Sequence, residues 1–387
     1  MKIVHVVGAR PNFMKLAPVR AAFLKYRQVS QRVIHTGQHY DAGMSNIFFE
    51  ELGLPAPDTN LEVGSCGHAE QTAKVMLGLE PQIREMRPDL VLVYGDVNST
   101  LATALVCSKL LIPVGHVEAG LRSFDRTMPE EVNRILTDQL SDLLFTPSGD
   151  GDQNLEHEGV PAERVHLVGN VMIDTLVKLL PKALECWENG ALERLGRSPY
   201  VLVTLHRPSN VDDAGVLGQL LHTLGEIAKS IRVLFPLHPR TRKHIESLGL
   251  ETGGLELLEP AGYLEFLALQ YRASAVVTDS GGVQEETTFL GVPCLTVREN
   301  TERPVTVREG TNRLVGNDTA SLLEAMEEVL SGRGKKGTRP GLWDGRAAER
   351  IASVVMEWAA AGGSKLRRGG KPAEAEHFHA VAGSKSN

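Results

Sequence analysis

Short apolar runs rich in Val, Ile and Leu alternate with longer stretches of helical period along most of the chain. This alternation is typical of parallel β-sheets joined by crossover helices, because such strands are buried on both faces. In the first half we predict helices at 12–26, 68–86, 99–110 and 129–139, between strands at 3–7, 32–35, 90–93, 114–117, 143–146 and 165–168. The second half repeats the pattern, with helices at 215–230, 264–272, 284–290 and 319–330, and strands at 201–204, 233–236, 255–258 and 275–278.

The length of 387 residues is too great for one compact core and indicates two such units in series. We therefore predict an α/β protein of two Rossmann-like, doubly wound domains, 1–170 and 171–344, facing each other across a cleft. Residues 345–361 have the pattern of a final amphipathic helix. Residues 362–387 offer few apolar side chains to bury, and we predict that this tail is disordered.

Composition narrows the class of protein. A formal net charge of −7 argues against nucleic acid as the main partner, since nucleic-acid binders usually carry a basic face. We expect neither a membrane span nor a leader segment, because the first strand follows Met1 almost directly, and so expect a cytoplasmic protein. The four cysteines form no C-x-x-C pair, which argues against a disulfide framework or a cysteine zinc site.

Polar side chains follow the strands of the first half, at the sheet edge where open α/β folds bind ligands. In the segment GARPNFMK, Arg10 stands at the mouth of a helix, where its charge suits a diphosphate, and Lys15 lies one turn further in. Asp96 and Glu118 follow two later strands, and Glu130 and Glu131 open a helix in the segment MPEEVNR. The sequence therefore predicts cations and carboxylates at one edge of the first sheet.

Most of these residues also have a simpler explanation. Arg10 and Lys15 suit an ordinary solvated turn, Asp96 is a residue type that caps helices, and one of Glu130 and Glu131 suits a helix N-terminus. Three acidic sites at one edge nevertheless favour a functional cluster. Because the acids lie in separate loops and the histidines lack zinc spacing, we predict no metal site, and proton transfer is the better interpretation.

In the second half, the segment TDSGGVQEE joins a strand to a helix. Gly281 and Gly282 would let an anion approach the N–H groups at that helix N-terminus, with the Ser280 hydroxyl as a further donor. Either Glu285 or Glu286 would then accept hydrogen bonds from ribose hydroxyls. A plain strand-turn-helix connection is the alternative.

Two other strands of the second half are followed by basic residues. His206 and Arg207 follow one strand, and His238 and Arg240 follow the next; we interpret His238 as structural. No G-x-G-x-x-G follows the first strand and no G-x-x-x-x-G-K-[ST] occurs, so nicotinamide and P-loop chemistry lack their usual signals.

Taken together, these motifs resemble the non-hydrolysing UDP-N-acetylglucosamine 2-epimerase family. The segments that carry the resemblance are GARPNFMK, YGDVNSTLA, GHVEAGLRS, MPEEVNR, VTLHRPSN, TDSGGVQEE and TERPVTVREGTNRLVG. The similarity runs in consistent order from about residue 1 to residue 361. It implies a two-domain glycosyltransferase-B architecture with the final helix crossing back to the first domain, a homodimer, and interconversion of UDP-GlcNAc and UDP-ManNAc.

The resemblance also implies functions for particular residues. The implied catalytic groups are Asp96, Glu118, Glu130 and His206. Phe266 falls where the family packs a ring on uracil, and Arg134 lies in the matching helix of the first half. The remaining substrate contacts implied by motif are Arg10, Lys15, Ser280, Gly281, Gly282 and Glu286.

The implied reaction explains why acidic residues and diphosphate-binding residues occur together. The C2 hydrogen of the sugar is not next to a carbonyl, so direct deprotonation would leave a poorly stabilised carbanion. Loss of UDP from C1 during C2 deprotonation gives 2-acetamidoglucal instead. UDP then returns to C1 after C2 is protonated on the opposite face. We assign the two proton-handling roles to Asp96 and Glu118, and a supporting role to Glu130. No nicotinamide cofactor and no obligatory metal is needed. The diphosphate is assigned to His206, Arg10 and Ser280.

Some segments depart from the well-known bacterial form, which binds a second, activating UDP-GlcNAc. Asp41 and Ser65 stand at two of those activator positions, so we do not expect activation by substrate. The segments HTGQHYDAGMSNIFFEEL, LHRPSN and PLHPRTR are similar instead to epimerases of UDP-2,3-diacetamido-2,3-dideoxyglucuronate, which is the alternative substrate. A glycosyltransferase of the same architecture and a non-catalytic sugar-nucleotide sensor are two further alternatives.

Overall fold

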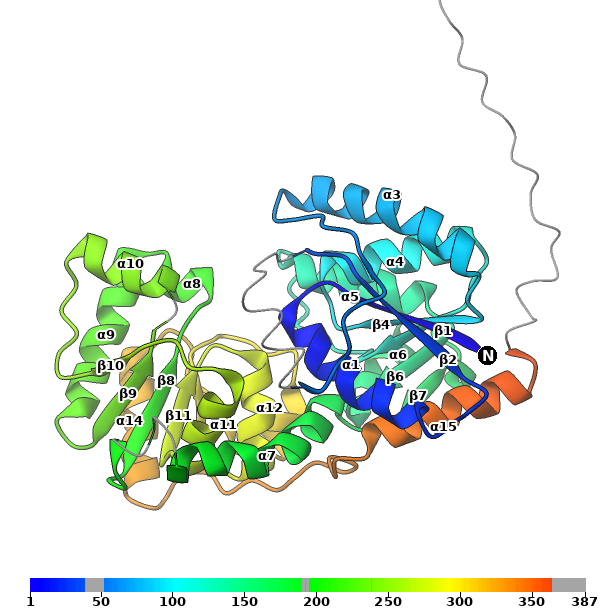
Figure 1. Ribbon diagram of the computed structural model, residues 1–387. Coiled ribbons are helices and arrows are strands. Elements are labelled where there is room, and N and C mark those ends of the chain that lie inside the picture. The colour runs from blue at the N-terminus through cyan, green and yellow to red at the C-terminus, as the bar shows by residue number, and fades with distance from the viewer. Residues whose placement is uncertain (39–51, 190–191, 193–194, 238, 364–387) are drawn as a thin grey trace, which may run out of the picture.

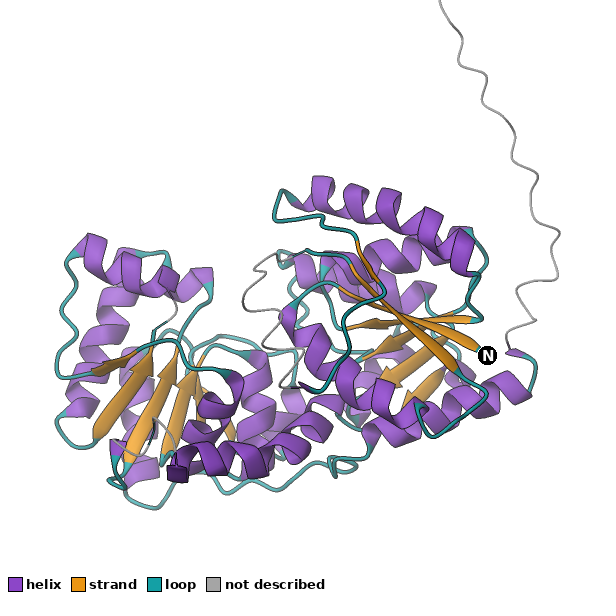
Figure 2. Cartoon of the chain, in the orientation of Figure 1, coloured by secondary structure: helices purple, strands orange, loops and turns teal. Residues whose placement is uncertain are grey.

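The computed structural model describes residues 1–38, 52–189, 192, 195–237 and 239–363. Asp41, His238 and all but the first two residues of the predicted tail lie outside these ranges. The chain forms two lobes side by side, each with a central sheet and helices around it (Figures 1 and 2). Among the described residues, no helix has the length and apolar character needed to cross a membrane.

The first lobe is built on a seven-stranded parallel sheet in the order β3-β2-β1-β4-β5-β6-β7. Its strands are β1 (Lys2–Val7), β2 (Ser30–His35), β3 (Thr59–Asn60), β4 (Leu90–Tyr94), β5 (Val114–Val117), β6 (Leu143–Thr146) and β7 (Val165–Leu167). Its helices are α1 (Arg10–Phe23), α3 (His68–Met86), α4 (Asn98–Lys109), α5 (Pro129–Leu140), α6 (Gly149–His157) and the 3₁₀ turn at Ala162–Arg164. Every residue of β4 and β5 is buried, as expected for central parallel strands covered on both faces.

The second lobe has a six-stranded parallel sheet in the order β10-β9-β8-β11-β12-β13. Its strands are β8 (Tyr200–Thr204), β9 (Arg232–Pro236), β10 (Glu256–Leu258), β11 (Ala275–Thr278), β12 (Cys294–Thr296) and β13 (Asn312–Leu314). Its helices are α8 (Pro208–Val211), α9 (Ala214–Ala228), α10 (Pro239–Leu248), α11 (Tyr263–Arg272), α12 (Gly281–Leu290), α13 (Pro304–Arg308) and α14 (Thr319–Leu330).

In both sheets the strand order reverses beside the first strand, which makes a topological switch point. In the first lobe the switch lies between β1 and β4, and in the second it lies between β8 and β11. Open α/β sheets bind ligands outside the carboxyl ends of the strands at such points. The loops after these four strands are therefore the places to look for a site.

One long helix connects the lobes, and a second returns the chain to the first lobe. α7 (Val171–Asn189) packs against α1 of the first lobe and against α11 and α12 of the second (Figure 1). α15 (Ala347–Ala360) returns to the first lobe and packs on α1, and the carboxylate of Asp174 in α7 accepts hydrogen bonds from the N–H groups of Ala347 and Ala348 at 3.1 and 2.7 Å. Because α7 contacts helices of both lobes, the domain boundary at residue 170 stays a prediction.

The predicted fold class is confirmed, with differences in the shorter elements. The sequence analysis missed β3, β12, β13, α6, α8, α10 and α13, and it placed the start of α12 three residues late. β12 and β13 have three residues each, and β13 includes Asn312 and Arg313. Such strands carry too few apolar residues for a periodic signal, and they form because neighbouring strands supply hydrogen-bond partners.

Candidate active site at the junction of the two lobes

Glu118 and Lys15 form a buried ion pair on the first lobe. Glu118 follows β5 and Lys15 lies on the second turn of α1, and the distance between Oε2 and Nζ is 2.5 Å. Glu118 has a φ of +74°, a left-handed conformation that costs a non-glycine residue about 1–3 kcal/mol. The N–H groups of Glu118 and Ala119 both donate to the Phe145 carbonyl, which holds this conformation. Strained backbone of this kind is concentrated at functional sites.

Asp96, which follows β4, is paired with Arg134 of α5. The distance between Arg134 Nε and Asp96 Oδ2 is 3.0 Å, and the same guanidinium also contacts Glu131. Burial alone would raise the pKa of Asp96, but the positive charges of Arg134, Lys15 and Arg303 outweigh it and lower that pKa. Asp96 is therefore a carboxylate at neutral pH.

Arg303, the residue before α13, joins the two lobes. Its Nη2 lies 3.1 Å from Glu118 Oε1 across the junction, and its Nε lies 3.0 Å from Glu285 Oε1 in α12. Its Nη1 contacts the carboxylate of Glu302. One guanidinium thus touches three buried carboxylates, one of which belongs to the other lobe.

Glu302 is the acidic centre of an arginine cluster on the second lobe. Its Oε2 lies 2.8 Å from Arg298 Nη2, its Oε1 contacts Arg303, and Arg207 Nη2 is 3.8 Å away. Although burial opposes ionisation, the charges of Arg303, Arg298 and Arg134 hold the pKa of Glu302 well below its usual range. This part of the junction is rich in the planar cations that bind phosphate groups.

The N-terminus of α12 lies beside this cluster. Ser280 is the N-cap, and its side chain makes no capping hydrogen bond. A Cβ atom at Gly281 would lie 2.3 Å from Arg303 Nη1, so no larger residue fits there without displacing the arginine. At Gly282 a Cβ atom would meet nothing within 4 Å. The helix therefore presents its first N–H groups next to a guanidinium, as an anion site requires.

Glu286 and Phe266 lie further along the second lobe. Glu286 is buried and accepts hydrogen bonds from the Tyr263 hydroxyl at 2.9 Å and from Gln270 Nε2 at 2.6 Å. Burial raises the pKa of Glu286. Phe266 is partly buried against the apolar core. In this state the Glu286 carboxylate is occupied by protein donors.

His206 is half-exposed and paired with a buried acid. Its Nδ1 lies 2.9 Å from Asp279 Oδ1, and the backbone N–H of Arg207 donates to the same carboxylate at 2.9 Å. The buried Asp279 has a lowered pKa because these donors outweigh the effect of burial. The carboxylate orients the imidazole ring and leaves its other nitrogen for a ligand.

The structure gives different environments to the two adjacent glutamates of MPEEVNR. Glu131 is buried and accepts hydrogen bonds from the N–H groups of Ser123 and Phe124, so it supports the loop before α5. Glu130 is exposed at the first turn of α5, and its charge acts on Arg207 of the other lobe. Arg10 is exposed at the start of α1.

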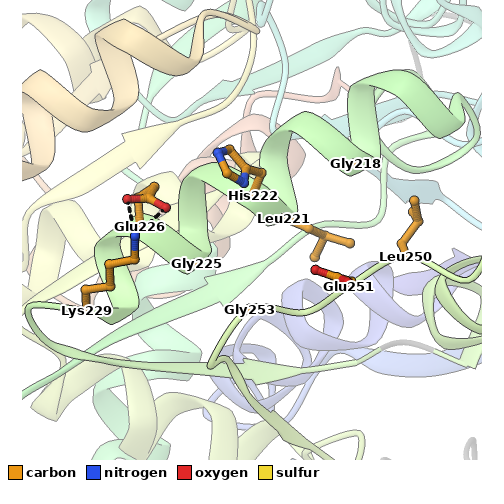
Figure 3. A pocket seen from close by; sticks show the side chains of 9 residues that line it. All are labelled: Gly218, Leu221, His222, Gly225, Glu226, Lys229, Leu250, Glu251 and Gly253. Atoms are coloured by element: carbon orange, nitrogen blue, oxygen red, sulfur yellow. Dashed lines mark hydrogen bonds and ion pairs between the residues drawn. The ribbon is translucent and has the colours of Figure 1, made fainter.

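A separate cavity of about 210 Å³ lies at α9, away from these residues (Figure 3). Its lining includes His222 and the ion pair of Glu226 with Lys229, whose atoms are 2.7 Å apart. None of the predicted site residues lines it. The candidate site is therefore the charged junction between the lobes.

Comparison with known proteins identifies the family. Residues 22–356 match the family described as UDP-N-acetylglucosamine 2-epimerase. The chain belongs to this family. It is 42% identical over 365 residues to the UDP-N-acetylglucosamine 2-epimerase of Methanocaldococcus jannaschii, covering 92% of this chain and 99% of that one. It is also 42% identical over 360 residues to the UDP-2,3-diacetamido-2,3-dideoxy-D-glucuronate 2-epimerase of Pseudomonas aeruginosa, covering 92% of this chain and all of the other.

Solved structures of the family have the same architecture. The M. jannaschii epimerase in complex with UDP-GlcNAc and UDP superposes with a TM-score of 0.83, covering 92% of this chain and 100% of that one. A lipopolysaccharide outer core galactosyltransferase, 14% identical with a TM-score of 0.53, shares the fold alone. The family resemblance and the two-domain fold predicted from the sequence are thus confirmed.

The sequence analysis assigned no function to three residues of the junction: Arg298, Glu302 and Arg303. They lie between β12 and α13, a segment without a strong strand or helix signal. The motif TERPVTVREGTNRLVG contains Glu302 and Arg303, and its two adjacent opposite charges are a signal that could have been followed. Their partners come from other parts of the chain and could not be read from the segment itself.

We predict that Glu285→Gln changes the pH dependence of stability. Burial raises the pKa of Glu285 from 4.5 to about 7, so the folded state holds a proton there that the unfolded state has lost. The stability from this group is present below about pH 4.5 and is lost as pH rises through about 7. Glutamine does not ionise, so the variant should gain stability relative to wild type between about pH 5 and pH 8, measured by urea unfolding.

A suitable control is Glu256→Gln. Arg232 lowers the pKa of Glu256, so this carboxyl is ionised at both ends of the range, about pH 5 and about pH 8. Its effect on stability should not change between them. An equal effect of Glu285→Gln at both pH values would contradict the prediction.

Proposed function

We propose that this chain is an isomerase that catalyses reversible epimerisation at C2 of UDP-N-acetylglucosamine, giving UDP-N-acetylmannosamine. The observation that carries the proposal is the contact of Arg303 with Glu118 at 3.1 Å, which joins the acidic loops of one lobe to the anion-binding helix of the other. A nucleotide sugar held there has its diphosphate beside α12 and its sugar beside the carboxylates. The family's activity and the M. jannaschii complex with UDP-GlcNAc and UDP support the choice of substrate.

The reaction proceeds by elimination and re-addition. A base removes the C2 proton while the bond from C1 to the diphosphate oxygen breaks, which gives 2-acetamidoglucal and UDP. A proton is then delivered to the opposite face of C2, and UDP adds back at C1. The two products of elimination must stay together, so the closed junction of the lobes is needed to exclude water and retain UDP.

Asp96 and Glu118 are the proposed proton-handling pair. Both lie at carboxyl ends of central strands, and each is held by fixed cations. Asp96 is ionised at neutral pH, as a base must be before it takes a proton. Arg134 orients Asp96, and Glu130, exposed at the start of α5, supports acid-base chemistry from the edge of the site.

The second lobe binds the nucleotide in this proposal. The N–H groups after Ser280, at Gly281 and Gly282, hold the diphosphate together with Arg303. Two residues complete the nucleotide site, since Phe266 stacks on uracil and Glu286 exchanges its protein donors for ribose hydroxyls. Further contacts to the diphosphate and sugar come from His206, Arg10 and Lys15.

UDP-2,3-diacetamido-2,3-dideoxyglucuronate is the second candidate substrate. One observation favours it: the chain has the same 42% identity to the P. aeruginosa enzyme named for that substrate as to the M. jannaschii epimerase. Incubation with each UDP-sugar separately, followed by NMR of the C2 epimers, distinguishes the two. The preferred substrate is the one with the larger kcat/KM.

We predict that Asp96→Asn abolishes proton exchange at C2. In deuterated water, wild type should incorporate solvent deuterium at C2 of UDP-GlcNAc, and the variant should be slower by about 10²–10⁴-fold while its UDP affinity changes little. Glu226→Gln, on the exposed face of α9, is the matched acid-to-amide control and should exchange at the wild-type rate. Full activity of Asp96→Asn would remove this residue from the mechanism. Transfer of the sugar to an added acceptor, without deuterium at C2, would indicate a glycosyltransferase. UDP-GlcNAc that remains unchanged would indicate a non-catalytic sensor.

We predict that Gly282→Ala weakens UDP binding without affecting the fold. The methyl group would enter open space in the free protein, but it would stand where an anion approaches the α12 N–H groups. The Kd for UDP measured by calorimetry should rise about tenfold or more, which corresponds to at least about 1.4 kcal/mol. Gly149→Ala, in equally open space at the start of α6, should bind UDP normally. An unchanged Kd for Gly282→Ala would place the diphosphate elsewhere.

We also propose that the protein works as a homodimer in the cytoplasm. An apolar groove of about 600 Å³ between α3 and α5 supports a second copy as partner; the exposed Val132 lines it, and the exposed Leu77 directly follows the lining residue Met76. Leu77→Glu should then convert a particle of twice 42.1 kDa into one of 42.1 kDa by light scattering, whereas Leu24→Glu, at the exposed residue that follows α1, should stay dimeric. A Leu77→Glu protein that stays dimeric would place the interface on another surface.

A further inference from the structure

His116, in the middle of β5, faces a hydrogen-bond acceptor at each of its two ring nitrogens. The ring is fully buried. Its Nδ1 lies 2.6 Å from Asp138 Oδ1 of α5, and its Nε2 lies 2.8 Å from the carbonyl oxygen of Gly95, the residue before Asp96. Neither nitrogen contacts solvent or the proposed substrate groups.

These contacts determine the protonation of the ring. A backbone carbonyl oxygen can only accept, so Nε2 must carry a proton. Burial opposes ionisation of Asp138, but the Arg122 guanidinium lies 2.7 Å from its Oδ2 and the Gly120 N–H donates to the same oxygen, so the side chain is a carboxylate and its pKa is lowered. A carboxylate also only accepts, so Nδ1 must carry a proton as well. Both nitrogens therefore donate, and the ring is an imidazolium.

We infer that His116 is a buried imidazolium that positions the two proton-handling loops by donating a hydrogen bond to the Gly95 carbonyl. The inference rests on the proposed function for the roles of Asp96 and Glu118. His116 lies two residues before Glu118 in β5 and holds the peptide group next to Asp96. One side chain thus links both loops.

The buried charge is compensated on its other side. Besides His116, Asp138 accepts hydrogen bonds from the Gly120 N–H at 3.1 Å and contacts Arg122 at 2.7 Å. Arg122 in turn forms a bidentate pair with Glu158, the residue after α6, with both N–O distances 2.7 Å. The charges alternate along this row from Glu158 to His116. A compensated row of this kind keeps a buried cation stable where an isolated one would lose its proton.

The Gly95 peptide group is fixed from several directions. Gly95 has a φ of +63°, and its N–H donates to the Val117 carbonyl at 3.0 Å. The Nζ of Lys15 lies 2.8 Å from the point where a Cβ atom would stand. The carbonyl of Gly95 then points to His116 Nε2. Rotation of this peptide would move Asp96, so the hydrogen bond from the imidazolium to the Gly95 carbonyl fixes the position of a proton-handling carboxylate.

Two substitutions separate the two hydrogen bonds. The amide nitrogen of Gln reaches the position of Nε2, and that of Asn reaches the position of Nδ1. His116→Gln should therefore keep the Gly95 contact, whereas His116→Asn should keep the Asp138 contact and release Gly95. We expect kcat to fall by about 10²-fold in His116→Asn and clearly less in His116→Gln, with UDP affinity unchanged in both because UDP binds the other lobe. Equal kcat values for the two variants, or a loss of kcat that is larger in His116→Gln, would overturn the inference.

A spectroscopic test does not depend on how the variants fold. Nitrogen-15 NMR of the wild-type histidine rings at about pH 7.5 should show two protonated nitrogens for His116. His5 on β1 is an internal control, because burial lowers its pKa to about 4 and its ring should show a single protonated nitrogen in the same spectrum. A neutral His116 ring would overturn the inference even if epimerase activity is found. An imidazolium at His116 in a protein without epimerase activity would instead leave the ring state intact and refute the proposed function.

Discussion

The contact of Arg303 with Glu118 is the interaction on which the rest of the site depends. It is the point where the loops of two separately built sheets share one charge pair, with the guanidinium also holding Glu285 and Glu302. A buried arginine and its carboxylates are stable only as a set, because removing one partner leaves an uncompensated charge in a medium that solvates it poorly. The relative placement of the two lobes and the ionisation of the acids are therefore linked.

This linkage has a consequence for ligand binding. The free site already balances its arginines with carboxylates, so a diphosphate brings excess negative charge into the junction. Glu285, whose pKa is raised to about 7, is the group able to take up a proton and reduce that excess. On the first lobe the acids face fixed cations instead, and Asp96 stays ionised beside Arg134. In the proposed function, these different charge environments suit the second lobe to anion binding and the first lobe to proton transfer.

Prediction from the sequence succeeded where the signal is local. The central strands β4, β5 and β11 are continuous apolar runs, and Asp96, Glu118 and Ser280 follow their carboxyl ends as predicted, because a parallel sheet brings the ends of neighbouring strands to one edge. It failed where an element depends on its neighbours. The three-residue strands β12 and β13 have no periodicity of their own, and the loop carrying Arg298, Glu302 and Arg303 has no pattern that names its partners. Residue type alone also could not separate Glu130 from Glu131, since adjacent residues with one chemistry differ only in what surrounds them.

The amino-acid sequence by itself determined the class of fold, the order of the elements and the family, because apolar periodicity and motif order are properties of the chain alone. Only the tertiary structure decided which carboxyls are paired, which are buried and which carry protons. Glu118 meets Arg303 across 185 residues of chain, and His116 meets Asp138 and Gly95 on two different elements. The physical reason is that a pKa and an ion pair depend on distance and on desolvation, which folding sets and residue order does not.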